Sequence, residues 1–295
     1  MNYKNSEKIV NAGINLLLII IGIAAIYPMW FVLIASVSSP GAIANGQVIF
    51  LPKGFHLDGY KALLEDKSVW IGYKNSIIYT FVGTILCLAV QIPAAYALSR
   101  KTLPGRRFIN ILLVITMYFS GGMIPSFLLI NALGLYDSMW ALVLPAAVSA
   151  FDMVIIRNYF ENNIPNELYD AACIDGCGYF KFFFNIVLPL STAIIAIVTM
   201  FSVQSHWNEY MNARLYIRSF GKRNLQQAVQ AITATVDSSL SALETEDYDL
   251  FLAKMQEKQL LKYSVVVVAM VPLVMLYPFI QRYLIKGVMV GAVKG

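Results

Sequence analysis

Long apolar runs, separated by shorter polar stretches, set the pattern of this 295-residue chain. Six runs approach or exceed the ~18 residues that an α-helix needs to cross a hydrocarbon core about 30 Å thick. They predict spans at about 9–36, 77–98, 108–130, 140–160, 187–207 and 263–283. The runs are apolar on every face, whereas barrel strands alternate over about 10 residues, so we expect helices. The pattern predicts an all-α integral membrane protein with a single transmembrane domain over 1–295.

Composition supports this class. Hydrophobic residues make up 58% and charged residues 13% of the chain, and the mean hydropathy is +0.65. So few polar side chains cannot cover a soluble globule. Lys4 and Lys8 precede the first apolar run as they would in a secretory signal, but the run exceeds the ~7–15 residues of a signal's apolar region and no A-x-A-like site closes it. We therefore expect it to be retained as a span.

Short-loop charge predicts the orientation. The connection "SRKTLPGRR" carries Arg100, Lys101, Arg106 and Arg107, and short basic loops stay in the cytoplasm. Six spans then place both termini in the cytoplasm, including a tail at 284–295, and the long connections 37–76 and 208–262 outside the cell. The pI of about 9.0 accordingly reflects membrane orientation, and no nucleic-acid partner is expected.

The predicted cytoplasmic loop at 161–186, which begins "ENNIPNELYDAACIDGCGYF", combines an acidic helix with an aromatic segment. Pro165 suits the start of a helix whose positive end lies near Glu167 and Asp170, and glycines at 176 and 178 end it. Ala171 and Ala172 leave a surface with almost no side chain, so a partner can approach closely. The segment is interpreted as a lever joined to the following span.

These residues resemble the EAA loop of ABC-importer permeases, the element that fits a groove of the ATPase subunit. The ending "YPFIQRYLIKGVMVGAVKG" resembles the maltose-type sugar permeases, and within them the LplC/YtcP-like oligosaccharide permeases. Two departures are Asp170, where a Glu is usual, and Cys177, where an Ala is usual. The resemblance implies that these residues couple the chain to the ATPase: Glu167, Asp170, Ala171, Ala172, Asp175, Gly176, Ile186 and Pro189.

The resemblance implies a type I ABC importer permease with six transmembrane helices in the plasma (inner) membrane of a bacterium. The implied partners are a second permease subunit in a heterodimer, two ATPase subunits, an extracellular sugar-binding protein and the lipid bilayer. The implied cargo is the class of oligosaccharides, which includes acidic or uronate-containing chains. A permease for a non-sugar solute, a self-sufficient secondary carrier or channel, and a scaffold without transport remain as alternatives.

Catalytic and metal-binding patterns are weak. The sequence contains no G-x-x-x-x-G-K-[ST] phosphate loop, so ATP and Mg²⁺ are expected on a separate ATPase subunit. We expect no cofactor on this chain and no enzyme activity of its own. His56 and His206 have no partners at ligand spacing, and Cys173 with Cys177 gives two ligands where a zinc site needs four. No metal site is predicted.

Asp152 is the serious candidate for an ionisable group inside a span, with Arg157 five residues further on. It suits a structural pair, a hydrogen bond to a neighbouring span, or a role in transport. A proton relay needs more than one such group. This scarcity argues against a self-sufficient carrier, and the lever-like loop argues against a scaffold.

The substrate path is predicted from chemistry that suits sugars, which stack on aromatic rings and hydrogen-bond to amides and hydroxyls. The stretch "SVQSHWNEY" offers Gln204, Trp207 and Asn208 at the outer end of the fifth span. Tyr118 and Asn131 are expected to face them from the third span. The alternative is an interfacial aromatic belt with polar residues at its edge.

Three further features bear on movement and docking. "GGMIPS" at 121–126 and several prolines within the spans are interpreted as hinges. The stretch 237–264 in the second outer loop has an amphipathic pattern and is predicted to contact the sugar-binding protein. Resemblance to the family implies that the tail reaches between the ATPase subunits.

Overall fold

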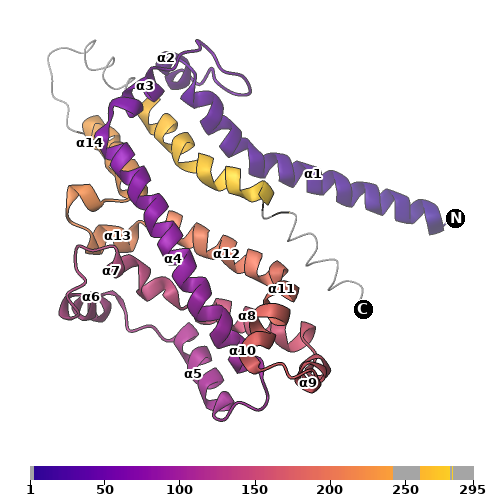
Figure 1. Cartoon of the computed structure of the whole chain (residues 1–295). Coiled ribbons are helices and arrows are strands. Elements are labelled where there is room, and N and C mark those ends of the chain that lie inside the picture. Colours follow the sequence, from indigo (N-terminus) through magenta and orange to yellow (C-terminus); the bar gives the residue numbers. More distant parts are fainter. Residues whose placement is uncertain (1–2, 242–259, 280, 282–295) are drawn as a thin grey trace. The chain divides into compact units, whose positions relative to one another are not determined.

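The computed structural model describes residues 3–241, 260–279 and 281, and all regular structure in these residues is helical (Figure 1). The predicted tail at 284–295 and most of the predicted amphipathic segment, 242–259, lie outside the described residues. The elements are α1 (Tyr3–Ser36), α2 (Pro40–Ala44), α3 (Asp58–Glu65), α4 (Lys67–Ser99), α5 (Arg106–Tyr118), α6 (Met123–Ala132), α7 (Trp140–Val143), η1 (Pro145–Ala147), α8 (Ala150–Asn163), α9 (Asn166–Ile174), α10 (Tyr179–Phe182), η2 (Phe183–Val187), α11 (Leu188–Leu190), α12 (Thr192–Trp207), α13 (Met211–Tyr216), η3 (Phe220–Lys222), α14 (Leu225–Ser241) and an unlabelled helix, Leu260–Phe279.

Within the described residues, four helical stretches are long and apolar enough to cross a membrane: Val10–Ser36, Lys67–Ser99, Trp140–Asn163 and Leu260–Phe279. Two bent pairs pass the same test together, α5 with α6 and Tyr179–Leu190 with α12. The number of spans is therefore six if each bent pair is one span. The predicted class, an all-α membrane protein, is confirmed.

Helix α4 begins at Lys67, earlier than the span predicted from residue 77. The amide of Asn75 donates to the carbonyl oxygens of Gly221 and Arg223, at 2.9 and 2.8 Å. The hydroxyl of Ser76 accepts a hydrogen bond from the backbone N–H of Leu225 at 2.9 Å. Asn75 and Ser76 fell in the predicted connection 37–76, but they lie inside the helix, where backbone groups of the 221–225 segment satisfy their side chains.

Three predicted spans are interrupted. α5 and α6 meet at 114°, where Gly122 adopts a φ of +84° that a side chain would disfavour. The pair around Ser191 meets at 79°, two residues after Pro189. Between η1 and α8 the chain is extended at Val148 and Ser149. The "GGMIPS" segment therefore does break a helix, as its composition indicated; whether it moves stays a prediction.

The described residues form two compact units. The first comprises, among the described residues, 3–69, 229–241 and 260–271. In it, the connection after α1 is held by Ser38, whose hydroxyl donates to Ile34 O at 2.6 Å and accepts from Lys53 N at 3.2 Å. The ring of Phe31 lies edge-on to Tyr263 at 6.0 Å. Most of the apolar side chains of α1 are exposed, as expected for a helix that faces lipid.

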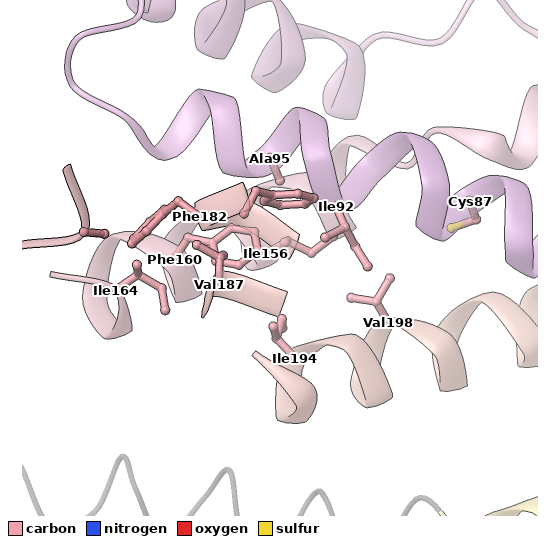
Figure 2. Packing of buried hydrophobic residues seen from close by; sticks show 12 residues of the cluster. Cys87, Ile92, Ala95, Ile156, Phe160, Ile164, Phe182, Val187, Ile194 and Val198 are labelled. Atoms are coloured by element: carbon pink, nitrogen blue, oxygen red, sulfur yellow. The ribbon is translucent and has the colours of Figure 1, made fainter. Parts of the chain in front are cut away.

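The second unit comprises, among the described residues, 70–228, 272–279 and 281, and contains the sites discussed below. Its largest apolar cluster joins α4, α8, α9, α10, η2 and α12 (Figure 2). Phe160, Phe182, Ile156 and Val187 are at most 1% exposed. Within this unit α9 and α10 lie beside the carboxyl end of α4, whereas the 221–225 segment bonds near its amino end (Figure 1).

A glycine lets α4 and α12 approach closely. A Cβ built on Gly83 would lie 2.2 Å from Nε2 of His206, whose ring is 8% exposed. His206 Nδ1 lies 2.8 Å from the carbonyl oxygen of Ser202, so this nitrogen carries the hydrogen. The other ring nitrogen therefore faces the bare surface of Gly83.

Asp137 joins the connection before α7 to the connection after α13. Its carboxylate accepts hydrogen bonds from Arg218 N and Ser219 N, both at 2.9 Å, from the Ser219 hydroxyl, and from Lys222 Nζ at 3.1 Å. The residue adopts a φ of +55°, which is uncommon outside glycine but tolerated by Asp. The Ser219 bonds, with help from Arg218 and Lys222, lower the pKa of Asp137 far below its ordinary value.

We expect Gly83→Ala to destabilise the second unit by about 1–3 kcal/mol, because the added methyl overlaps a buried ring. The measurement is the melting temperature of the purified protein in detergent. Gly22→Ala on α1 is the matched control, since a Cβ there meets nothing within 4 Å. Adding His206→Ala to Gly83→Ala should recover part of the loss; equal melting of the two glycine variants would contradict the close contact.

The Asp137 interactions predict that stability falls in acid at this end of the second unit. Since folding lowers this pKa, the carboxylate stabilises the fold above its ordinary value of 3.8 and loses that contribution as the pH falls below it. Between about pH 6 and pH 3, Asp137→Asn should start less stable and decline less steeply than the unaltered protein. Asp170→Asn, on an exposed carboxylate, is the control. Parallel stability curves for the unaltered protein and Asp137→Asn would refute the role.

Candidate coupling surface and membrane cavity

The predicted lever is a short helix with defined ends. Pro165 occupies the N-cap position of α9 with extended backbone angles, and Glu167 lies in the first turn. At the other end Gly176 adopts a φ of +73°. Its N–H bonds to Cys173 O at 3.0 Å and the next N–H, of Cys177, bonds to Ala172 O at 2.9 Å. This paired arrangement ends a helix and needs a left-handed residue, hence the glycine.

One face of α9 packs on the molecule itself. Ala172 is 5% exposed and belongs to the cluster of Figure 2, with Leu168 and Tyr169 half-buried beside it. The expectation that Ala171 and Ala172 together form an open surface is wrong for Ala172. The two alanines are adjacent, so a helix directs them about 100° apart, and only Ala171 is exposed.

The opposite face is open and mixes charge with apolar surface. Glu167, Asp170, Ala171 and Ile174 follow the i, i+3, i+4, i+7 spacing of one helical face and are all exposed. Ile174 is 87% exposed and Phe180, just beyond the glycines, is 82% exposed. Large apolar side chains this exposed on a polar helix are typical of a surface that another protein covers.

Arg100 braces α9 against the end of α4. Its guanidinium lies 4.7 Å from the ring centre of Tyr96, 5.3 Å from Tyr169 and 5.5 Å from Phe182. It also donates to the side-chain oxygen of Asn166 at 3.2 Å. Cation–π contacts of this kind contribute about 0.5–2 kcal/mol each. In the sequence, Arg100 served only as a charge that indicated topology. Tyr96 stands one turn before it, but Tyr169 and Phe182 are distant in the chain, so the complete set of rings could not be predicted.

The remaining predicted coupling residues vary in exposure. Asp175 and Gly176 are exposed at the end of α9, Pro189 is exposed in α11, and Ile186 is half-buried against the apolar cluster. Tyr169 stacks on Tyr179 at 5.1 Å. Side-chain hydrogen bonds with Cys173 and Tyr179 raise the pKa of Tyr169, so this ring stays neutral at cellular pH.

A cavity of about 390 Å³, lined by both apolar and polar side chains, opens among α4, α8 and α12. It forms where the backbone is extended before α8, and the hydroxyl of Ser149 caps that helix by accepting from Asp152 N at 3.2 Å. Asp152 is 9% exposed, and about 13 Å of helix α8 separates it from Glu161. The side chains that line the cavity include Ser149, Phe151, Asp152, Phe201, Ser205 and His206.

Of the roles left open for Asp152, an ion pair with Arg157 is not among the contacts of the described residues. Arg157 donates to the side-chain oxygens of Asn110, at 2.6 Å, and Asn158, at 3.0 Å, and lies 3.6 Å from Glu161. Residues five apart on a helix point in different directions, whereas residues four apart share a face. Asp152 therefore faces the cavity, and Glu161 is the carboxylate beside Arg157.

The predicted substrate-path residues are not gathered in one place. Trp207 is 3% exposed and lies edge-on to Tyr73 at 5.9 Å, so its ring face is not available to a sugar. Gln204 and Asn208 are exposed. Tyr118 is 77% exposed at the end of α5, and Asn131 lies across the 114° bend in α6 and donates to Phe127 O.

The cavity could not be predicted from the sequence because the residues that line it come from three helices. Two local sequence patterns do point to parts of it. Ser149 stands three residues before Asp152, the spacing of a capping side chain. Ser202 and His206 stand four apart and so share the face of α12 that meets α4. Within the described residues no group of three or more His, Cys, Asp or Glu side chains is placed to hold a metal ion.

Comparison with known proteins places these features in a family. Residues 69–290 match the family model described as "Binding-protein-dependent transport system inner membrane component". The chain is 36% identical over 278 residues to the polygalacturonan/rhamnogalacturonan transport system permease protein YtcP of Bacillus subtilis, covering 94% of this chain and 96% of that protein. It is 35% identical to the protein LplC of the same organism, covering 93% and 91% of the two chains.

A solved structure of similar fold supports the same family assignment. A chain in the crystal structure of a bacterial ABC transporter involved in the import of the acidic polysaccharide alginate superposes with a TM-score of 0.83. The two chains are 30% identical, and the match covers 96% of this chain and 99% of that one.

Proposed function

Because the chain belongs to the family of binding-protein-dependent transport system inner membrane components, and is thus an ABC importer permease, we propose that it passes oligosaccharides into the cytoplasm under the drive of a partner ATPase. The observation that carries this proposal is the exposed acidic and apolar face of α9, braced by Arg100 and continuous with the core of the second unit. A docked ATPase would press on α9 and so move the spans that share its apolar cluster.

The proposed cargo is an oligosaccharide, with acidic or uronate-containing chains as the favoured class. Support comes from the relatives, one a polygalacturonan/rhamnogalacturonan transport system permease protein and another a chain of a transporter involved in alginate import. The cavity near Asp152 suits the ring of a sugar, because its carboxylate accepts hydrogen bonds from hydroxyl groups and its phenylalanines offer apolar surface. A uronate would have to turn its own carboxylate away from Asp152.

The proposed assembly contains this chain, a second and different permease chain, two ATPase subunits with their ATP and Mg²⁺, and an extracellular sugar-binding protein. It stands in a bacterial plasma membrane with both termini of this chain in the cytoplasm, as the basic 99–107 connection favours. An importer for a non-sugar solute is the alternative. The secondary-carrier alternative is weakened by family membership, since members depend on binding proteins by description.

Coupling is tested by Ala171→Trp, which adds bulk to the exposed face of α9 without touching the core. In membrane vesicles carrying the intact complex, this variant should be present in normal amount but import labelled oligogalacturonate at least about tenfold more slowly. Ala44→Trp, the same change at another exposed alanine, is the control. Ala172→Trp should instead lower the amount of folded protein. Normal import by Ala171→Trp would sink the coupling role, and import by the isolated chain without ATPase would favour a carrier.

The cargo route is tested with a cysteine reporter. In a variant with Cys87, Cys173 and Cys177 replaced by Ser, Ser205→Cys places a thiol on the cavity wall. Oligogalacturonate should slow its modification by a small thiol reagent in the working complex, while Ala44→Cys reacts unchanged. Undiminished reaction at Ser205→Cys during active import would remove this cavity from the path but leave the permease assignment intact.

A further inference from the structure

A second cavity, of about 890 Å³, lies at the end of the second unit where the α4–α5 connection, α5 and α8 meet. Four basic side chains and one carboxylate line it: Lys101, Arg106, Arg107, Arg157 and Glu161. Figure 1 shows the α4–α5 connection and the start of α5 at this end of the unit. The excess of positive charge makes it a site for an anion.

Contacts within the chain fix two of the cations. Arg106 donates through Nε to Leu98 O at 2.7 Å and pairs with Glu161. Arg157 lies 3.6 Å from the same carboxylate and donates to Asn110. These two guanidinium groups share one carboxylate and are 27% and 19% exposed. They are therefore positioned at the cavity wall before any ligand arrives, and their charge is only half neutralised.

The cavity continues into an apolar wall. Ile111, Val114 and Ile115 of α5 line it and are 50%, 44% and 45% exposed. They lie one to two turns beyond Arg107 along a helix that passes the test for a membrane span together with α6. An anion that filled the whole cavity would need a charged head and a long apolar tail.

We propose that this cavity binds the headgroup and upper acyl chain of an anionic glycerophospholipid. Basic cavities between helices at the membrane surface suit phosphate headgroups, and guanidinium groups bind phosphate through paired hydrogen bonds. An acidic sugar would satisfy the cations but leave the isoleucines and the valine uncovered. Neither the headgroup site nor the lipid partner depends on the proposed transport function.

The test removes the charges of Lys101 and Arg107, which line the cavity and are not part of the pairing with Glu161. The combined variant Lys101→Gln and Arg107→Gln is compared with Lys67→Gln and Lys74→Gln, the same charge change at exposed positions near the other end of α4. Phosphatidylglycerol and phosphatidylcholine are titrated onto the purified protein, with whatever subunits co-purify, and bound lipid is counted by native mass spectrometry. Melting temperatures establish that both variants are folded.

The cavity variant should bind phosphatidylglycerol on the order of tenfold more weakly than the unaltered protein, the control variant should not, and phosphatidylcholine should bind weakly to all three. Arg107→Lys, which keeps the charge, should retain most of the binding. Equal phosphatidylglycerol binding by cavity and control variants, or equal binding of the two lipids by the unaltered protein, would overturn the proposal. So would crosslinking of Ile115→Cys to a co-purified permease subunit rather than to lipid, since the partner chain would then fill the cavity.

Discussion

Hydrocarbon cannot hydrogen-bond to a peptide group, and this one constraint shapes the second unit more than any side-chain contact does. A helix satisfies its own backbone, so each interruption has to be compensated by a residue type that the sequence supplies locally. Gly122 removes the steric cost of a sharp change of direction. Ser149 caps the helix that restarts after the extended pair at 148–149. Irregular backbone in a membrane protein is tolerated where it is buried in protein or borders a cavity, and the cavity near Asp152 is found beside one such interruption.

The same constraint accounts for the close fit of α4 against its neighbours. Asn75 and Ser76 are polar positions in an apolar helix, and both are paired with backbone groups of the 221–225 segment. Gly83 admits the buried ring of His206. A helix that faced only lipid would need none of these, so the polar and small residues of α4 record where other parts of the second unit lie against it.

The class of fold could be predicted because six long apolar runs and a low charge content admit few alternatives. The start and end of α9 were also predictable, because Pro165 and Gly176 act through local backbone geometry. What could not be predicted depended on distant contacts. The sequence does not show that Ala172 is buried against the apolar cluster while Ala171 is exposed. It does not show that Tyr73 packs against Trp207. Nor does it show that three aromatic rings surround Arg100. Charge along one helix left several roles open for Asp152, and the structure shows that Arg157 lies near Glu161, at a spacing of four.

The Arg100 cage has a mechanical consequence. α9 is joined to α12 through the chain itself, by way of α10, η2 and α11, and it is joined to α4 by Arg100 with its aromatic neighbours. A body attached at a single point can pivot and dissipate an applied push, whereas a body attached at two points transmits torque. Force applied to the exposed face of α9 would therefore rotate α4 and α12 together as one rigid body. It would not merely bend the α10–α11 connection.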